Sequence, residues 1–328
     1  MSDPNLTDVG GSRTGYVQTP EGQTNQVQWN FGWVNDPVAV VRVVQQQVYP
    51  SASATPVGQI GADELPKQVF LWVAYREMFK KNPPPTNQGQ VGSCVGFETC
   101  NAIRRTMAVD IWQKGEYEEY TDICEEVVYG GSRVEVGNGR LGPQDGSVGA
   151  WAAQFVKQWG VLARGKYGQY NLTRYSEQTC RNFGTWGVPD ELEPIARQHP
   201  VRDITVVNSW PEAKRMLANG SGIAVCSNQG FSLTRDSRGV AAPVGHWGHC
   251  MCLDGYIVLD SGEEFGHFTN SWGDKMHTGP VGTWGDPGPD GFWADWSVIR
   301  GMLAQRDSWA FAGLDGFFPR EIDWDQLF

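Results

Sequence analysis

Three segments of the chain carry apolar residues at helical spacing. The segment that begins at Cys94 holds an apolar stripe at intervals of three and four residues, formed by Cys100, Ile103, Met107 and Ile111. Residues 147–162 repeat the pattern and end near Gly160, which suits a helix C-terminus. Residues 209–222 begin with Ser and Pro, which are favoured at a helix start, and contain Gly220 after the last apolar turn. We predict a helix in each segment.

The later part of the chain changes to strand-like patterns. Short runs at 222–228, 249–259 and 266–272 are alternating or β-branched and are broken by Gly and Asp, which predicts strands. The Val-rich segment 36–50 is also predicted to be a strand. Residues 1–30, rich in Gly, Thr, Gln and Asn, are predicted to be extended or disordered. The first part is therefore mainly helical and the second mainly strand.

Length, composition and charge limit the class of protein. The 328 residues suffice for one large two-lobed domain or for two domains, and 40% apolar residues with 15 Trp can fill a packed core. A formal net charge of −11, without a basic run, argues against nucleic acid or an anionic membrane surface as the main partner. No apolar stretch reaches the roughly 18 residues that a transmembrane helix needs.

The cysteines and the N-terminus indicate a compartment. Residues 1–22 lack a basic start followed by an apolar block, so we expect no secretory signal. The seven cysteines then favour reduced thiols over a disulfide framework. We expect a cytoplasmic protein, or a virion-associated one if a virus encodes it.

Candidate chemistry begins at Cys94. A thiol attacks only as thiolate, and the unpaired N–H groups at a helix N-terminus lower the pKa of a cysteine placed there. Gly92 and Ser93 directly before it leave room for a substrate backbone. The alternative is a small buried cysteine that merely opens a helix.

A working thiolate also needs a base, a group that orients the base, and donors for the oxyanion. His249 opens one of the predicted strands, which would aim its imidazole inward from a rigid element. Asn270 follows 21 residues later and can accept from the imidazole N–H, while Trp272 can keep water off that bond. Gln88 offers a side-chain amide donor close before Cys94.

Three blocks of sequence resemble the papain-like cysteine peptidases, in that family's order. They are Gln88-Gly89-x-x-Gly92-Ser93-Cys94-x-x-Phe97, Gly248-His249 with Gly255-Tyr256, and Asn270-Ser271-Trp272-Gly273. Weaker similarity continues between the blocks, and the resemblance covers roughly residues 64 to 317.

The resemblance implies a role for each matched residue. Cys94 would be the nucleophile, His249 its base, Asn270 the group that orients His249, Gln88 part of the oxyanion hole, and Trp272 a shield for the Asn–His bond. Gly92 and Ser93 would support the nucleophile. The substrate cleft would be lined by Gly146, Ser147 and Gly248. The resemblance implies no metal and no organic cofactor.

The resemblance also implies the fold and the domain organisation. We expect an α+β, papain-like two-lobed fold, with a helical lobe carrying Cys94, a β-rich, barrel-like lobe carrying His249 and Asn270, and the active-site cleft between them. The expected division is an N-terminal extension at 1–63, partly extended or disordered with one strand, a peptidase domain at 64–317, and a C-terminal tail at 318–328.

This sequence departs from the family pattern in three ways. Val91 replaces a cysteine that the family usually pairs in a disulfide, which suits a reducing compartment. Val95 stands where an aromatic residue is common, which bears on substrate preference and not on the chemistry. Residues 1–63 do not resemble the family's inhibitory propeptide, so the sequence leaves open how activity is controlled.

The function we expect is a cysteine endopeptidase of a bacterium or a virus of bacteria, acting on protein or peptide through a thioester acyl-enzyme. One alternative is a papain-fold hydrolase of cell-wall peptides, although the Asn-Ser-Trp-Gly block favours protein cleavage. The other is a non-enzymatic structural or docking protein of a larger assembly that keeps a papain-like core.

Two further features carry alternatives. His246, His249, Cys250 and Cys252 could suggest zinc, but alternate residues of a strand point to opposite faces, so we expect no metal site. The aromatic segments 28–37 and 315–328 are expected to pack back on the domain. Alternatively, they form a docking surface for a larger assembly, or the N-terminal one lies in the cleft as a propeptide.

Overall fold

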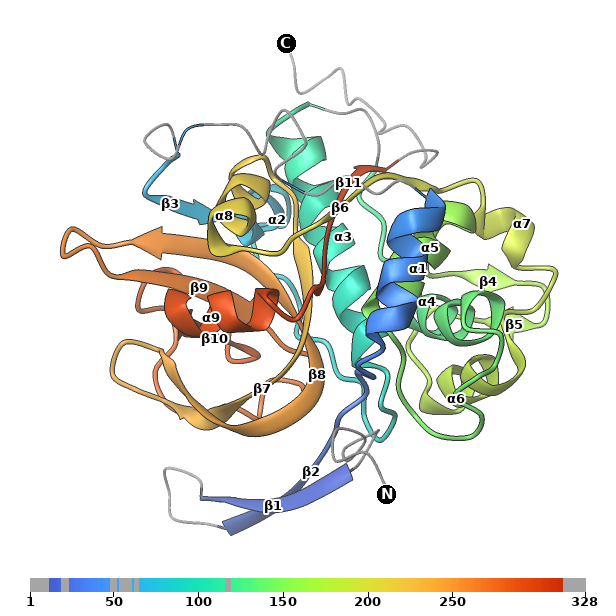
Figure 1. Ribbon diagram of the computed structural model, residues 1–328, viewed down its shortest axis with the longest axis horizontal. Helices are drawn as coiled ribbons and strands as arrows, with labels where there is room; N and C mark the ends of the chain where they lie inside the picture. Colours follow the sequence, from blue (N-terminus) through green and yellow to red (C-terminus); the bar gives the residue numbers. More distant parts are fainter. Residues whose placement is uncertain are drawn as a thin grey trace.

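Helices and strands are arranged along the chain largely as the sequence pattern predicts (Figure 1). The computed structural model describes residues 12–18, 24–47, 52, 61, 65–115 and 119–314. The helices are α1 (Pro37–Gln47), α2 (Trp72–Phe79), α3 (Cys94–Trp112), α4 (Glu125–Gly131), the π-helical η4 (Ser132–Val136), α5 (Gly149–Gln158), α6 (Glu177–Trp186), α7 (Glu193–Ala196), α8 (Trp210–Ala218) and α9 (Trp296–Leu303). The strands are β1 (Ser12–Gln18), β2 (Thr24–Asn30), β3 (Gln68–Phe70), β4 (Lys166–Tyr167), β5 (Tyr170–Asn171), β6 (Val201–Val206), β7 (Ile223–Arg235), β8 (Ala241–Val258), β9 (Glu264–Thr269), β10 (Gly291–Asp295) and β11 (Asp307–Leu314).

The three predicted helices are confirmed as α3, α5 and α8. The hydroxyl of Ser209 caps α8 by accepting from the backbone N–H of Glu212. Gly160 and Gly220 follow α5 and α8 with φ values of 78° and 91°, a left-handed backbone that glycine adopts without strain. The three predicted strands are confirmed within β7, β8 and β9.

The strand predicted at 36–50 is wrong, because this segment forms helix α1. The Asp36 carboxylate accepts from the backbone N–H of Ala39 at 2.8 Å and caps the helix. Val40 and Val43 are buried while Val38 and Val41 are exposed, which is a helical period hidden in a Val-rich run. Before α1, strands β1 and β2 pair antiparallel, so the described parts of 1–30 are extended.

One antiparallel sheet dominates the second half of the chain, in the strand order β10-β9-β8-β7-β11-β6, with β3 paired to β8. The edge strands β10 and β6 do not pair with each other, so the described strands of the expected barrel-like lobe form an open sheet and no closed barrel. Helix α3 packs on β7, β8 and β11, and α9 packs on β7 and β9.

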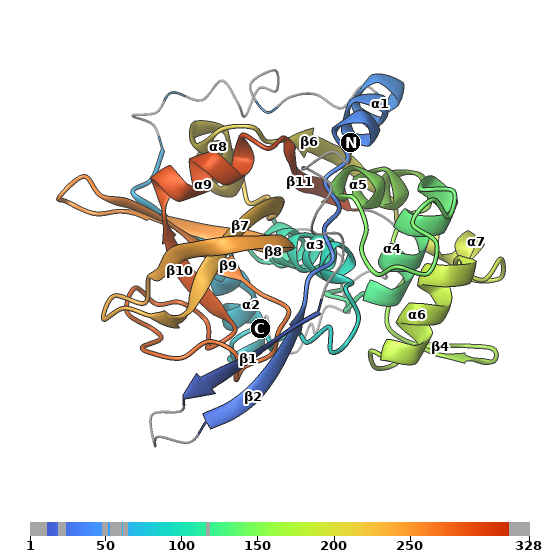
Figure 2. The same cartoon turned by 60° about the horizontal axis from the view of Figure 1, so that its bottom comes forward.

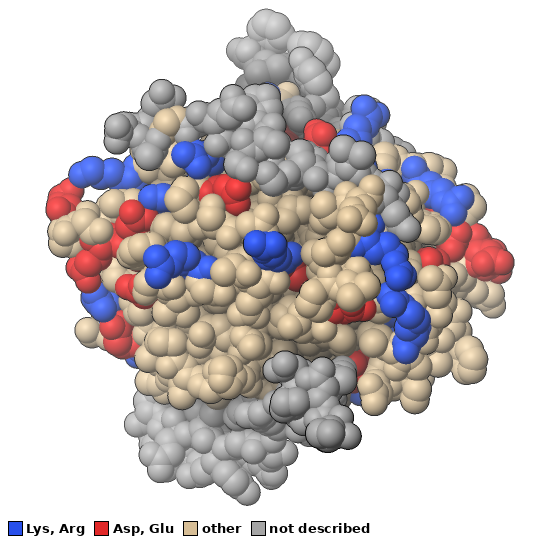
Figure 3. Space-filling view, in the orientation of Figure 1, with Lys and Arg blue, Asp and Glu red and all other residues tan. Residues whose placement is uncertain are grey.

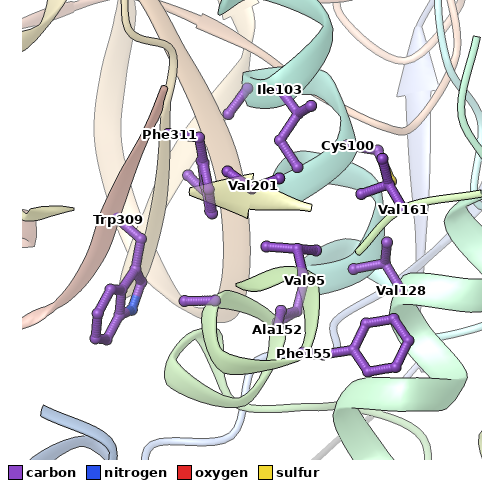
Figure 4. Close-up of a cluster of buried hydrophobic side chains, with 14 of the residues drawn as sticks. Val95, Cys100, Ile103, Val128, Ala152, Phe155, Val161, Val201, Trp309 and Phe311 are labelled. Atoms are coloured by element: carbon purple, nitrogen blue, oxygen red, sulfur yellow. The ribbon is translucent and has the colours of Figure 1, made fainter. Parts of the chain in front are cut away.

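Helix α3 runs through the middle of the molecule, with strands β7 to β10 on one side and helices α4 to α6 on the other (Figures 1 and 2). Every residue from Cys94 to Ile111 is buried. Apolar side chains of α3, α4 and α5 meet those of β6 and β11 in one core cluster (Figure 4). The residues labelled there are Val95, Cys100, Ile103, Val128, Ala152, Phe155, Val161, Val201, Trp309 and Phe311.

Two adjacent arginines tie α3 to both of its neighbours. Arg104 bonds Glu125 at the start of α4, with 2.6 Å between Nη2 and Oε1. Arg105 bonds Asp254 on β8, with 2.8 Å between Nε and Oδ2. Asp254 is fully buried, and its other oxygen lies 2.7 Å from Nδ1 of His267 on β9. These pairs fix the helix that begins with Cys94 against the strand that carries His249.

Removing Asp254 should therefore destabilise the fold strongly. Asp254→Ala leaves Arg105 charged and unpaired in the interior, and we expect a loss of about 3–5 kcal/mol in the free energy of unfolding. Urea denaturation measures it. The matched control is Asp260→Ala, which breaks a solvent-exposed pair with Lys67 and should leave the free energy of unfolding close to that of the wild type. Equal losses in the two variants would contradict the role given to Asp254.

Candidate active site

Cys94 is the first residue of α3, as the sequence predicts, and it is completely buried. Burial raises the pKa of its thiol well above the usual value, and the nearby Cys250 thiol adds to the rise. Hydrogen bonding from the backbone of Cys250 and Gly32 opposes it only in part. The expectation that the helix start lowers this pKa is wrong for the arrangement seen here, because desolvation is the larger effect.

His249 lies on β8, and its Nε2 is 2.9 Å from Oδ1 of Asn270. Since an amide oxygen can only accept, Nε2 carries the proton and Nδ1 is left as the basic atom. Nδ1 has no hydrogen-bond partner among the described residues. Burial lowers the pKa of His249 to about 4, against the bond to Asn270. Trp272 stacks on the imidazole, with ring centroids 4.4 Å apart.

Asn270 is held by a residue that the sequence analysis missed. Its Nδ2 lies 3.2 Å from Nε2 of His277, so the amide nitrogen faces His277 and the amide oxygen faces His249. Burial lowers the pKa of His277 to about 3, so the ring is neutral, and because an amide nitrogen can only donate, Nε2 is the accepting nitrogen. The sequence contains no pattern that links His277 to Asn270, because the contact depends on how the loop after β9 folds back.

Gln88 is fixed by the residue after Asn270. The Ser271 hydroxyl donates to Oε1 of Gln88 at 2.8 Å, and the backbone N–H of Gln88 donates to the Ser271 carbonyl at 2.8 Å. With its oxygen so engaged, the Gln88 amide directs Nε2 toward the loop before Cys94, where it donates to Val91 O at 2.9 Å. The first and third sequence blocks are therefore joined directly.

The N-terminal residues Phe31–Val34, here termed the covering segment, lie across the expected substrate cleft. The backbone N–H groups of Gly32 and Trp33 both donate to Gly248 O, at 3.0 and 2.8 Å. Val34 N–H donates to Ser147 O at 2.9 Å, and Ser147 N–H donates to Gly32 O at 2.7 Å. Trp33 thereby forms a parallel bridge with Ser147.

The covering segment packs closely against the residues of the expected cleft. A Cβ placed on Gly32 would lie 1.9 Å from Gly92 O, and one on Gly146 would lie 3.0 Å from Gly32 O. The Phe31 ring packs against Trp247, His249 and Trp272, with centroid distances of 5.8, 6.2 and 5.9 Å. All of the cleft residues expected from the sequence thus contact the covering segment: Gly146, Ser147 and Gly248.

The remaining sequence expectations have separate outcomes. His246 is exposed, and the described residues hold no group of three metal-ligating side chains. All seven cysteines are free and buried.

Within the described chain, no helix has the length and apolar character needed to cross a membrane. Acidic and basic side chains are interspersed on the face seen in Figure 3. The aromatic segment at 315–328 lies outside the described residues.

Solved structures resemble this arrangement. No protein-family model matches the chain, and neither does any curated protein. Xylellain, a cysteine protease from Xylella fastidiosa, matches with a TM-score of 0.53 and 18% identity, over 87% of this chain and 92% of that one. Procathepsin B S9 from Trypanosoma congolense matches with a TM-score of 0.52 and 10% identity, over 87% and 86%. The chain has the papain-like cysteine protease fold. At these identities the papain-like fold is what is shared, and the activity must be argued from the site.

The covering segment should control access to Cys94. Gly32→Ala places a methyl group against the Gly92 carbonyl, so the segment can no longer lie across the site. We expect iodoacetamide to alkylate Cys94 at least about 10-fold faster in this variant than in the wild type, since the probe then reaches the thiol. Peptide mapping by mass spectrometry measures the rate. The control is Val38→Ala, at an exposed position on the neighbouring helix α1, which should leave the rate unchanged.

The two buried histidines should make the fold sensitive to acid. Their folded pKa values, about 4 for His249 and about 3 for His277, lie below the usual 6.5, so the unfolded chain takes up protons first as the pH falls. Their contribution to stability is complete above pH 6.5 and is lost as the pH falls toward 4, by up to about 1.4 kcal/mol per pH unit for each. Urea denaturation between pH 7 and pH 4 measures this.

A matched pair of variants isolates the histidine effect. His277→Gln should flatten the pH dependence of the free energy of unfolding, because one buried titrating ring is gone. His246→Gln, at an exposed position, should leave the slope as in the wild type. Equal slopes in all three proteins would contradict the assignment.

Proposed function

We propose that the protein is a cysteine endopeptidase that hydrolyses peptide bonds in proteins or peptides through a thioester acyl-enzyme. The observation that carries this proposal is the pairing of His249 Nε2 with Asn270 Oδ1, which presents Nδ1 as the base. Support comes from Cys94 at the start of α3 and from a fold shared with cysteine proteases.

The proposed reaction uses three side chains and one backbone N–H. His249 Nδ1 takes the proton of the Cys94 thiol, and the thiolate attacks the substrate carbonyl carbon. The Gln88 Nε2 and the backbone N–H of Cys94 donate to the oxyanion that forms. The imidazolium returns its proton to the leaving amine, which departs as the thioester forms. Water activated by His249 then attacks the thioester, releasing the acid and restoring the thiol.

Asn270 and Trp272 act through His249. Asn270 Oδ1 holds the Nε2 proton and so stabilises the imidazolium by a hydrogen bond. Trp272 covers the ring and excludes water from that bond. His277 holds Asn270 in the matching orientation.

The covered state is an inactive form of this enzyme in our proposal. The covering segment reaches the Cys94 thiol with the backbone of Gly32, while the Gly32 carbonyl accepts from the Ser147 N–H. The Gln88 amide meanwhile bonds Val91 O. Burial favours a neutral thiol beside a neutral imidazole, so the reactive ion pair is disfavoured until the segment leaves.

The proposed organisation follows from the same contacts. Residues 64–317 form a two-lobed peptidase domain, with the cleft between the helices that surround Cys94 and the strands that carry His249 and Asn270. Residues 1–63 supply the segment that covers this cleft.

Hydrolysis of unfolded casein by the Gly32→Ala protein tests the proposal. We expect cleavage that an epoxysuccinyl thiol inhibitor abolishes by modifying Cys94 alone. Cys94→Ala should remove activity, and His249→Ala should lower kcat by about 10²–10⁴-fold, as expected for loss of a general base. His246→Ala is the matched control and should retain activity. Undiminished cleavage in Cys94→Ala, or no cleavage and no Cys94 adduct in the Gly32→Ala protein, would refute the proposed function.

A further inference from the structure

The side chain of Trp33 fills a specific place beside the proposed catalytic residues. Only 3% of the residue is exposed, and its indole Nε1 donates to Oδ2 of Asp307 at 2.7 Å. Its backbone N–H simultaneously donates to Gly248 O, directly before His249. The buried carboxylate of Asp307 thus lies at the inner end of the volume that the Trp33 ring occupies, beside strand β8.

Asp307 is held in place by the surrounding protein. Oδ2 also accepts from the backbone N–H of Gly149 at 2.9 Å, and Oδ1 accepts from the indole Nε1 of Trp309 at 2.8 Å. Gly149 keeps the space beside the carboxylate clear, since a Cβ there would lie 2.7 Å from Oδ1. With N–H donors at both oxygens, Asp307 is an acceptor whose position does not depend on Trp33 alone.

A substrate would meet this place for geometric reasons. The covering segment is held by Gly248 O and by both backbone groups of Ser147. These main-chain groups are engaged by the covering segment here, and a peptide lying extended beside Cys94 would use them once the segment has left. A peptide bound to the same groups presents one of its side chains to the space that Trp33 vacates.

We propose that Asp307 is a specificity-determining residue, which makes the site select a tryptophan at the substrate position that enters the space occupied by Trp33. This inference rests on the proposed peptidase function and adds the substrate class. An indole supplies both the apolar body that fills the space and the N–H that satisfies Oδ2. Phenylalanine or leucine would leave that buried oxygen short of a donor, which is costly away from water.

The test uses the full-length protein and compares two probes that differ by one atom group. Peptidyl epoxysuccinates are prepared with tryptophan or with 3-benzothienylalanine, in which sulfur replaces the indole N–H, at each of the two residues nearest the reactive group. The rate constant for modification of Cys94 is measured in the wild type and in Gly32→Ala. The covering segment competes equally with both probes. The ratio of their rate constants therefore measures only how much the indole N–H improves binding in the volume that Trp33 vacates.

We expect the tryptophan probe to react about 10-fold faster or more in one of the two series, with the same ratio in both proteins. A ratio near one in both series, with Cys94 still modified, overturns the specificity inference and leaves the peptidase proposal intact. No modification of Cys94 by any probe in Gly32→Ala overturns both.

A second measurement tests the same acceptor without a substrate analogue. Trp33→Phe removes the N–H that the covering segment gives to Asp307, so we expect iodoacetamide to modify Cys94 about 5-fold faster or more than in the wild type. Trp309→Phe is the matched control, because it removes the other indole N–H from the same carboxylate without touching the segment. Equal acceleration in the two variants would mean general loosening and would contradict the role of the Trp33–Asp307 bond.

Discussion

The buried arginine pair on α3 is the constraint on which the rest of the structure depends. Arg104 and Arg105 are adjacent in sequence, so they leave a helix in different directions, and each enters the interior as a full charge. Buried charges are tolerated only when they are paired, so Glu125 and Asp254 must lie where they do. One helix is thereby fixed against α4 and against β8 at once. These ion pairs therefore set the position of Cys94, at the start of that helix, relative to His249, on that strand.

Much of the fold and most of the candidate site follow from local sequence pattern. The start and end of α8 could be predicted because the Ser209 cap and Gly220 act within one turn. The strand expected at 36–50 is wrong because the β-branched content of this segment favours a strand, whereas the three-residue spacing of the buried Val40 and Val43 is that of a helix. The open sheet could not be predicted, since whether its two edges meet depends on distant strands. His277 was missed for the same reason, because its contact with Asn270 is made by a returning loop.

The chemistry of the covered site follows from burial. The pKa of Cys94 is raised and that of His249 is lowered, and both changes come first from desolvation. They act together, because each favours the neutral partner of a pair whose reactive form is charged. Motif spacing identifies the two residues but carries no information on their solvation. The site is desolvated in part by Phe31–Val34, which lies about 60 residues before Cys94 in the sequence. This segment is too short for its own pattern to predict a structure.

A segment that covers the proposed peptidase site must bind without being cut, and the contacts of Gly32 and Trp33 meet these two demands separately. Gly32 has no side chain, so its backbone can approach Gly92 closely, and its carbonyl is engaged by the Ser147 N–H. Trp33 supplies binding through its ring and its bond to Asp307. Because the segment belongs to the same chain, its effective concentration is high and modest affinity suffices to keep the site covered. In the proposed specificity, a substrate competes best with the segment when it offers Asp307 an equally good donor, so the contact of Trp33 with Asp307 indicates which substrate side chain replaces it.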